Sequence, residues 1–192
     1  MKLILIRHGE TDYTRQKRYC GSAINAPLNN VGIKQIQKLK QLLQKKRVDV
    51  VYTSPLIRTI QTTNIIFENR PVRIYKTPLL RESNLGEWEG HTLTEIKKLF
   101  PEDVNKWYED PLRYGATNGE TPIILQRRVR RFLNRLLNTY KNNKRIKTIA
   151  IVTHSGPFRI IMGEVSGNGL KDFWKLEPKT GECKEVKLCL RN

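Results

Sequence analysis

The sequence lacks the long apolar run that a membrane-spanning helix needs. A helix that crosses a bilayer takes about 20 consecutive, mostly apolar residues, and no stretch of this chain approaches that length. The apolar start, residues 1–6, is too short for a secretory signal peptide, and Arg7 and His8 interrupt it at once. These features predict a cytoplasmic protein with no membrane partner.

Cysteine is scarce, with three residues in 192. Cys20, Cys183 and Cys189 are odd in number and form no Cys-x-x-Cys pair, so neither a disulfide framework nor a zinc site is expected. No set of Asp, Glu and His residues shows the spacing of metal ligands either. The sequence therefore predicts reduced thiols, no metal and no cofactor.

Acidic residues are half as numerous as basic ones, 18 against 36, which leaves a formal net charge of +18. We interpret most of this charge as solvated helix faces, and the alternative is a basic surface that binds nucleic acid. The sequence shows no nucleic-acid recognition motif and no basic run interleaved with aromatic residues, so no specific nucleic-acid partner is expected. The positive field would still attract anionic substrates.

What the sequence does have is a series of short apolar runs that alternate with helical patterns. Buried parallel strands are predicted at 2–6, 49–53 and 148–152, an edge strand at 72–75, and a half-buried last strand at 185–190. Helices are predicted from Ile33 to Leu43 with Asn29 or Asn30 as cap, from Ile124 to about Tyr140, over 155–165, and near 92–99 and 102–109. The pattern favours one domain, residues 1–192, with an α/β fold: a three-layer α/β/α sandwich around a mainly parallel sheet.

Histidines follow two of these predicted strands. Arg7 and His8 come directly after the first strand, and His154 comes directly after Thr153 at the end of the strand near 148–152. Because the carboxyl ends of parallel strands form the usual ligand crevice of such sheets, we expect both histidines in one pocket. The helix predicted just past His154 would turn its amino-terminal amides and dipole toward an anion. The arrangement favours phosphoryl transfer on a histidine.

Six motifs along the chain resemble those of the histidine phosphatase superfamily, also called the phosphoglycerate mutase-like family. They occur in the family's order and span residues 3–165. In sequence they are Arg7-His8-Gly9-Glu10-Thr11, Ala26-Pro27-Leu28 with Gly32, Ser54-Pro55-Leu56-Ile57-Arg58-Thr59-Ile60-Gln61-Thr62, Leu80-Arg81-Glu82 with Gly86-Glu87-Trp88-Glu89-Gly90, Asn118-Gly119-Glu120-Thr121 with Arg128-Val129, and Thr153-His154-Ser155-Gly156. The resemblance implies a phosphoglycerate mutase-like fold.

The resemblance also implies catalytic roles. His8 matches the nucleophile that forms a phosphohistidine. Arg7 and Arg58 have planar guanidinium groups whose paired N–H donors suit phosphate oxygens. His154 would complete the pocket, and Glu82 matches the general acid, with Glu87 and Glu89 as rival candidates nearby. Glu10 is interpreted as structural. Further substrate contacts are expected from Thr14, which stands where the family usually has Asn, and from Arg18, Cys20, Gly21 and Gly156.

For the reaction, the resemblance favours a metal-independent phosphatase that acts on small phosphomonoesters as a monomer or homodimer. The first expected substrate is α-ribazole 5′-phosphate, because residues 18–32 and 118–129 resemble that type of enzyme, and the alternatives are phosphoserine or a broad range of substrates. A cofactor-dependent phosphoglycerate mutase and a non-enzymatic basic nucleic-acid-binding module are the other hypotheses. Residues 83–120, which hold several aromatic residues, are interpreted as a lid that sets specificity.

Overall fold

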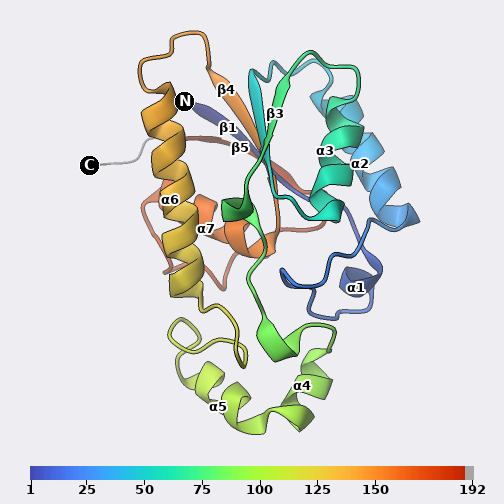
Figure 1. The fold of residues 1–192 in the computed structure, drawn as a ribbon, viewed down its shortest axis with the longest axis vertical. Helices are drawn as coiled ribbons and strands as arrows, with labels where there is room; N and C mark the ends of the chain where they lie inside the picture. The colour runs from blue at the N-terminus through green and yellow to red at the C-terminus, as the bar shows by residue number, and fades with distance from the viewer. Residues whose placement is uncertain (189–192) are drawn as a thin grey trace.

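A five-stranded sheet in the order β3-β2-β4-β1-β5 forms the centre of the computed structural model, which describes residues 1–188 (Figure 1). The strands are β1 (Lys2–Arg7), β2 (Val50–Thr53), β3 (Arg73–Lys76), β4 (Thr148–Thr153) and β5 (Cys183–Lys187). The first four are parallel, and β5 pairs antiparallel with β1. The sheet is therefore mainly parallel, and β3 is the edge strand that the sequence predicted.

Within residues 1–188, seven α-helices and two short 3-10 turns connect the strands. The helices are α1 (Asp12–Arg15), α2 (Asn30–Leu43), α3 (Ile57–Phe67), α4 (Leu93–Leu99), α5 (Pro101–Glu109), α6 (Pro122–Tyr140) and α7 (Ser155–Ser166), and the turns are η1 (Pro78–Leu80) and η2 (Gly86–Trp88). Asn29 is the N-cap of α2, and its side chain accepts a hydrogen bond from the Gly32 amide. No helix in the described part of the chain is long and apolar enough to cross a membrane.

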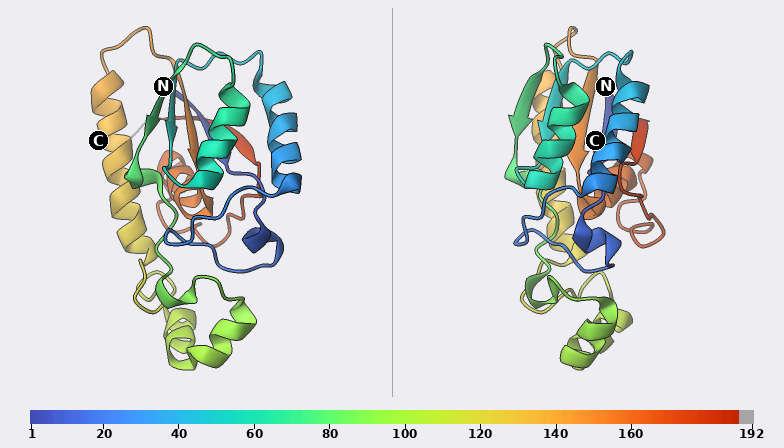
Figure 2. Two further views of the ribbon diagram at one scale, coloured as in Figure 1. Left: turned by 45° about the vertical axis from the view of Figure 1, so that its right-hand side comes forward. Right: turned by 90° about the vertical axis from the view of Figure 1, so that its right-hand side faces the viewer.

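The helices cover both faces of the sheet, as Figure 2 shows, and the predicted α/β/α sandwich is confirmed. Side chains alternate along β1: Leu3 and Leu5 join the core shared with α6 and α7, whereas Ile4 and Ile6 join the core shared with α2 and α3. All four are almost completely buried. Because the strand is buried on both faces, residues 3–6 are all apolar.

The last strand departs from the prediction. β5 covers Cys183–Lys187 instead of 185–190, so it begins two residues earlier than expected. Its range follows its partner, because the ladder runs from Ile6 opposite Cys183 to Lys2 opposite Lys187. Most of its side chains are exposed, so the strand offered little apolar alternation to read from the sequence. Cys189 and the predicted strand residues 189–190 lie outside the described residues.

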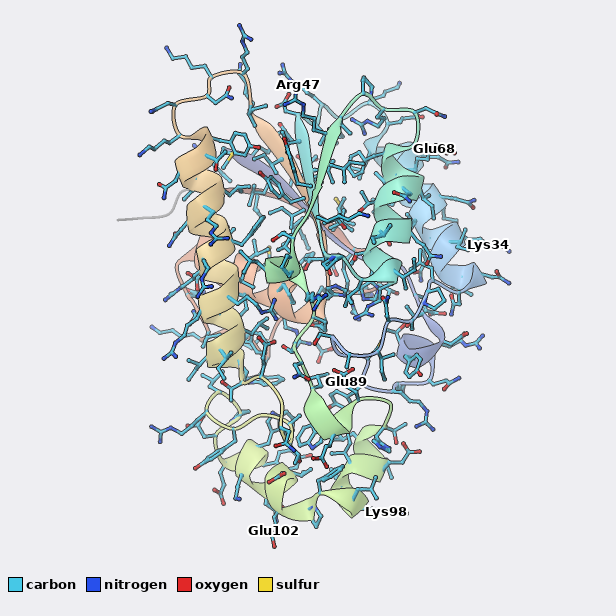
Figure 3. The ribbon with its side chains drawn as sticks, viewed as in Figure 1. Lys34, Arg47, Glu68, Glu89, Lys98 and Glu102 are labelled. Atoms are coloured by element: carbon cyan, nitrogen blue, oxygen red, sulfur yellow. The ribbon has the colours of Figure 1, made fainter. Side chains whose placement is uncertain are left out.

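Residues 83–120 project from the carboxyl end of the sheet. Figure 3 shows Glu89 where this segment joins the sheet, with Lys98 and Glu102 at its far side. The segment has a small core of its own, in which Trp88, Ile96, Val104 and Ala116 are buried. The two helices predicted near 92–99 and 102–109 are present as α4 and α5, and together with their core they form a wall beside the ends of the strands.

Candidate active site

His8 follows the carboxyl end of β1 and is buried. Its Nδ1 lies 2.7 Å from the carbonyl oxygen of Gly9, which only accepts, so Nδ1 carries the proton and the lone pair is on Nε2. A side chain at position 9 would place Cβ 2.7 Å from the Gly32 carbonyl oxygen, so glycine is needed there. Burial, reinforced by the charges of Arg58 and Arg7, holds the pKa of His8 well below its usual range. His8 is therefore a neutral imidazole at pH 7.

His154 lies directly beside His8, with 5.1 Å between the ring centroids. Arg58 Nε donates to His154 Nδ1 at 3.1 Å, which leaves the proton on Nε2, and Nε2 donates to Ser54 Oγ at 2.8 Å. Burial first, and then the charge of Arg58, holds the pKa of His154 well below its usual range. The ends of β1 and β4 thus bring two neutral imidazoles together.

Arg58 is completely buried, although its place near the start of α3 is compatible with a surface arginine. Besides the bond to His154, its guanidinium donates to the backbone carbonyls of Ile24, Cys20 and Gly21 at 2.9, 3.3 and 2.8 Å. Four of its five N–H groups are thus engaged by the protein. The structure therefore places Arg58 behind the histidines as a fixed positive charge, and Gly21 holds Arg58 instead of lining the cavity.

Arg7, the last residue of β1, faces the cavity beside His8. Its Nη1 donates to the Pro178 carbonyl, while its Nε is buried and has no hydrogen-bond partner. Burial lowers the pKa of Arg7 from its ordinary value. Of the two arginines predicted to bind phosphate, Arg7 lines the cavity and Arg58 does not.

Glu82 lies two residues past η1 and reaches the start of α7. Its Oε1 accepts hydrogen bonds from the backbone amides of Ser83, at 3.0 Å, and Gly156, at 3.1 Å. Arg128, from α6, donates to the carbonyl oxygens of Leu79, Arg81 and Glu82, at 2.9, 2.9 and 3.2 Å, and forms an ion pair with Glu120 at 2.8 Å. These bonds fix the segment that carries Glu82.

Glu87 and Glu89, the two alternative candidates for the general acid, lie outside the cavity. Glu89 accepts hydrogen bonds from the amides of Ala23, Ile24 and Leu85, so its carboxylate ties together the loop before α2 and the projecting segment. Glu87 accepts from the exposed Asn118 side chain. Neither lines the cavity, and Glu82 does. Glu10 accepts from the Asn29 side chain, which is a structural contact at the start of α2.

Three predicted substrate-binding residues line the outer part of the cavity: Thr14, Arg18 and Cys20. The Thr14 hydroxyl already donates to the Thr11 carbonyl at 2.9 Å, within the cap of α1. Arg18 makes a two-pronged ion pair with Glu95, at 2.7 and 3.1 Å. The polar groups of these two side chains are therefore engaged by the protein itself, whereas Gly156 presents its amide to Glu82.

The cavity has a volume of about 410 Å³, a size that suits a whole small molecule. Its lining includes Arg7, His8 and Glu82 together with aromatic side chains from residues 83–120 and 173–174. A wider hollow of about 770 Å³, between Lys2, Lys141 and Lys187, contains none of the predicted residues. The chemistry of the predicted residues therefore belongs to the smaller cavity.

Sequence reasoning missed Arg159, which lines the same cavity from α7. One signal was available, because Arg159 follows Gly156 by three residues, and positions three apart on a helix share a face. Trp174, which lies against the Arg159 guanidinium, was also missed. Its segment, after α7, showed no helical or strand period that would have placed it.

The fold and site define a class of enzyme. A neutral imidazole, guanidinium charges and a carboxyl group around one cavity are the parts that phosphoryl transfer through a histidine requires. The family comparison agrees: the model of the histidine phosphatase superfamily, branch 1, matches residues 3–189. The chain belongs to this superfamily, and its chemistry is that of a phosphoric monoester hydrolase.

Individual relatives support the same assignment. The chain is 32% identical to phosphoserine phosphatase 1 of Hydrogenobacter thermophilus over 174 residues, which cover 91% of this chain and 80% of that protein. It is 31% identical to the adenosylcobalamin/alpha-ribazole phosphatase of Escherichia coli over 183 residues, 94% and 87% of the two chains. The crystal structure of the alpha-ribazole phosphatase from Shigella flexneri superimposes with a TM-score of 0.90 at 30% identity, covering 98% of this chain and 91% of that one.

Proposed function

We propose that the protein hydrolyses small phosphomonoesters through a phosphohistidine on His8 Nε2. The hydrogen bond from His8 Nδ1 to the Gly9 carbonyl carries this proposal, because it fixes the tautomer that leaves the Nε2 lone pair for attack. Burial keeps the ring neutral by lowering the pKa of His8, so the nucleophile needs no deprotonation at neutral pH.

The reaction would proceed in two steps. In the first, Nε2 attacks phosphorus, the bond between phosphorus and the alcohol oxygen breaks, and protonated Glu82 gives its proton to the departing alkoxide. In the second, ionised Glu82 takes a proton from water as the water oxygen attacks phosphorus, and the nitrogen–phosphorus bond breaks to release phosphate. Arg7 would bind the phosphate oxygens, Arg58 would add fixed charge, and His154 would position Arg58.

Two phosphomonoesters are the first candidate substrates. α-Ribazole 5′-phosphate is supported by the motifs of residues 18–32 and 118–129 and by the relatives that act on it. Phosphoserine is supported by the relative that is named for it and by the positive charge of Arg159, which lines the cavity. The residues 83–120 that wall the cavity are the proposed specificity lid.

A panel of phosphomonoesters, assayed by phosphate release in the presence of EDTA, tests this function. We expect turnover of p-nitrophenyl phosphate and of at least one candidate substrate without added metal, since arginines supply the positive charge. Activity that EDTA abolishes and Mg²⁺ or Zn²⁺ restores would contradict the metal-independent mechanism. Efficient isomerisation of 3-phosphoglycerate, dependent on 2,3-bisphosphoglycerate, would favour the mutase alternative.

A further inference from the structure

Residues 20–25 form an irregular loop that sets the position of the Arg58 guanidinium. Three backbone carbonyls of this loop accept hydrogen bonds from Arg58, at 2.8, 2.9 and 3.3 Å. The Asn25 side chain accepts a hydrogen bond of 2.7 Å from the amide of Ile57, the first residue of the helix that carries Arg58. Because the loop contains no helix or strand, contacts from other segments must hold it in this conformation.

Glu89, in the projecting segment 83–120, provides such contacts. Its carboxylate accepts hydrogen bonds from the amides of Ala23, at 3.1 Å, and Ile24, at 2.8 Å. The carboxylate also lies directly against Gly21, because a Cβ at position 21 would be 2.1 Å from Glu89 Oε1. Figure 3 shows Glu89 where its segment meets the rest of the protein. Glu89 therefore joins the projecting segment to the loop.

Ile24 connects Glu89 to Arg58 through its own peptide groups. Its amide donates to Glu89 at 2.8 Å, and its carbonyl accepts from Arg58 at 2.9 Å. A negative and a positive side chain thus hold one residue of the loop, and hydrogen bonds to charged groups are the stronger kind. Burial lowers the pKa of Arg58, while the negative charges of Glu82 and Glu89 act in the opposite direction. The charge of Glu89 therefore favours the buried guanidinium, and its hydrogen bonds fix the loop that holds it.

A carboxylate is suited to this contact in a way that an amide is not. Both oxygens of Glu89 act as acceptors, since Oε2 accepts from the Ile24 amide and Oε1 accepts from the Leu85 amide. Glutamine has one acceptor oxygen and an NH2 donor group, so one of the two backbone amides would face a donor. Glu89 does not line the cavity, so its effect on the reaction would pass through the loop and Arg58.

We propose that Glu89 is a positioning residue for phosphoryl transfer, and that it acts by fixing the loop whose carbonyls hold Arg58 beside His154. The inference rests on the proposed function and adds to it a residue that touches neither the substrate nor the reacting atoms. Arg58 Nε donates to His154 at 3.1 Å, so a displaced guanidinium would change both the charge at the reaction centre and the support of that ring. Because Glu89 belongs to the projecting segment, the arrangement of Arg58 also depends on how that segment is joined to the loop.

Glu89→Gln tests the inference with p-nitrophenyl phosphate, whose leaving group needs no proton, so that general acid catalysis does not enter the result. We expect kcat/KM to fall by roughly 10- to 100-fold, the range for hydrogen bonds to charged groups. Glu87→Gln makes the same change in the same turn, at a side chain that accepts from Asn118, and should keep the wild-type value. A wild-type value in a folded Glu89→Gln protein would overturn the inference and leave the proposed function intact. Failure of the wild-type enzyme to hydrolyse p-nitrophenyl phosphate or any other phosphomonoester of the panel would instead overturn the proposed function.

A double-mutant cycle separates the positioning of Arg58 from a general effect on stability. In an Arg58→Lys background the side chain has no planar guanidinium for the loop carbonyls, so adding Glu89→Gln should lower kcat/KM by no more than about threefold. A loss as large as in the otherwise wild-type enzyme would show that Glu89 acts independently of Arg58, and would overturn the inference. If Glu89→Gln does not fold, Gly21→Ala takes its place in the cycle, because its methyl group would displace the Glu89 carboxylate and should give the same loss and the same coupling. Additive losses in that cycle would equally contradict the inference.

Discussion

Replacing Glu82 by glutamine removes the ionisable proton and the negative charge of the side chain and keeps its size. The side-chain oxygen of glutamine can still accept from the amides of Ser83 and Gly156, at the 3.0 and 3.1 Å seen for the carboxylate. The carbonyl bonds from Arg128 that fix this segment involve only its backbone, so they persist in Glu82→Gln. The variant therefore removes proton transfer by residue 82 and keeps the side chain in its position.

The expected loss depends on the leaving group. An alkyl alkoxide needs a proton as it departs, and general acid catalysis contributes roughly 10² to 10⁴ in rate. Single-turnover phosphorylation of Glu82→Gln by an alkyl phosphate should therefore slow by about that factor, and phosphorylation by p-nitrophenyl phosphate should slow far less. Because Glu82 would also activate the water of the second step, the activated substrate should show a burst followed by slow turnover.

The assay needs a matched control and has a clear contrary result. Glu87→Gln changes the same functional group at a site outside the cavity, where the side chain accepts from Asn118, so both substrates should react at wild-type rates. Equal losses for the alkyl and p-nitrophenyl substrates in Glu82→Gln, measured by rapid quench, would remove Glu82 from the acid role. The proton donor would then have to be sought among the other acids of the cavity.

Three further predictions concern pH, the support of Glu82 and the surface charge. The pKa values of His8 and His154 are held well below 6.5, so both rings gain protons on unfolding at mildly acidic pH. The free energy of unfolding in urea should therefore fall by about 2 kcal/mol between pH 6.5 and 5.5, and a flat profile would contradict their neutral state. Arg128→Met should lower stability by about 3 kcal/mol, while Arg127→Met, at an exposed position, should change it little in the same denaturation assay. The +18 charge should give weak DNA binding that disappears as salt rises in a fluorescence titration, and sequence-selective binding near physiological salt would favour the binding-module alternative.

The sequence predicted that the two histidines lie together because local patterns determine their positions. Residues 2–6 and 148–152 are apolar runs long enough to identify as buried strands, and parallel strands bring the residues that follow them to one edge. The position of His8 beside His154 follows from those two patterns alone. The sandwich fold and the positions of α4 and α5 could be predicted for the same reason, since their periodicity lies within each segment.

The features of the site that the sequence did not predict depend on contacts between distant segments. The Arg58 guanidinium donates to the backbone carbonyls of Cys20, Gly21 and Ile24, because the loop that carries them lies against the start of α3. No local sequence pattern predicts this contact. Arg159 is one more cation in a chain with 36 basic residues, and only the cavity distinguishes it. Its place became visible only in the structure, where its guanidinium lies against the rings of Phe173 and Trp174.

The most direct test of the central claim is to trap the phosphorylated enzyme. The enzyme would be mixed with a ³²P-labelled substrate, quenched in base and digested, and the labelled peptide mapped. We predict an acid-labile, base-stable label on His8 that is absent from His8→Ala and unchanged in His91→Ala, which removes the half-buried third histidine of the chain. A label on His154, or single-turnover hydrolysis with no labelled histidine, would contradict the account.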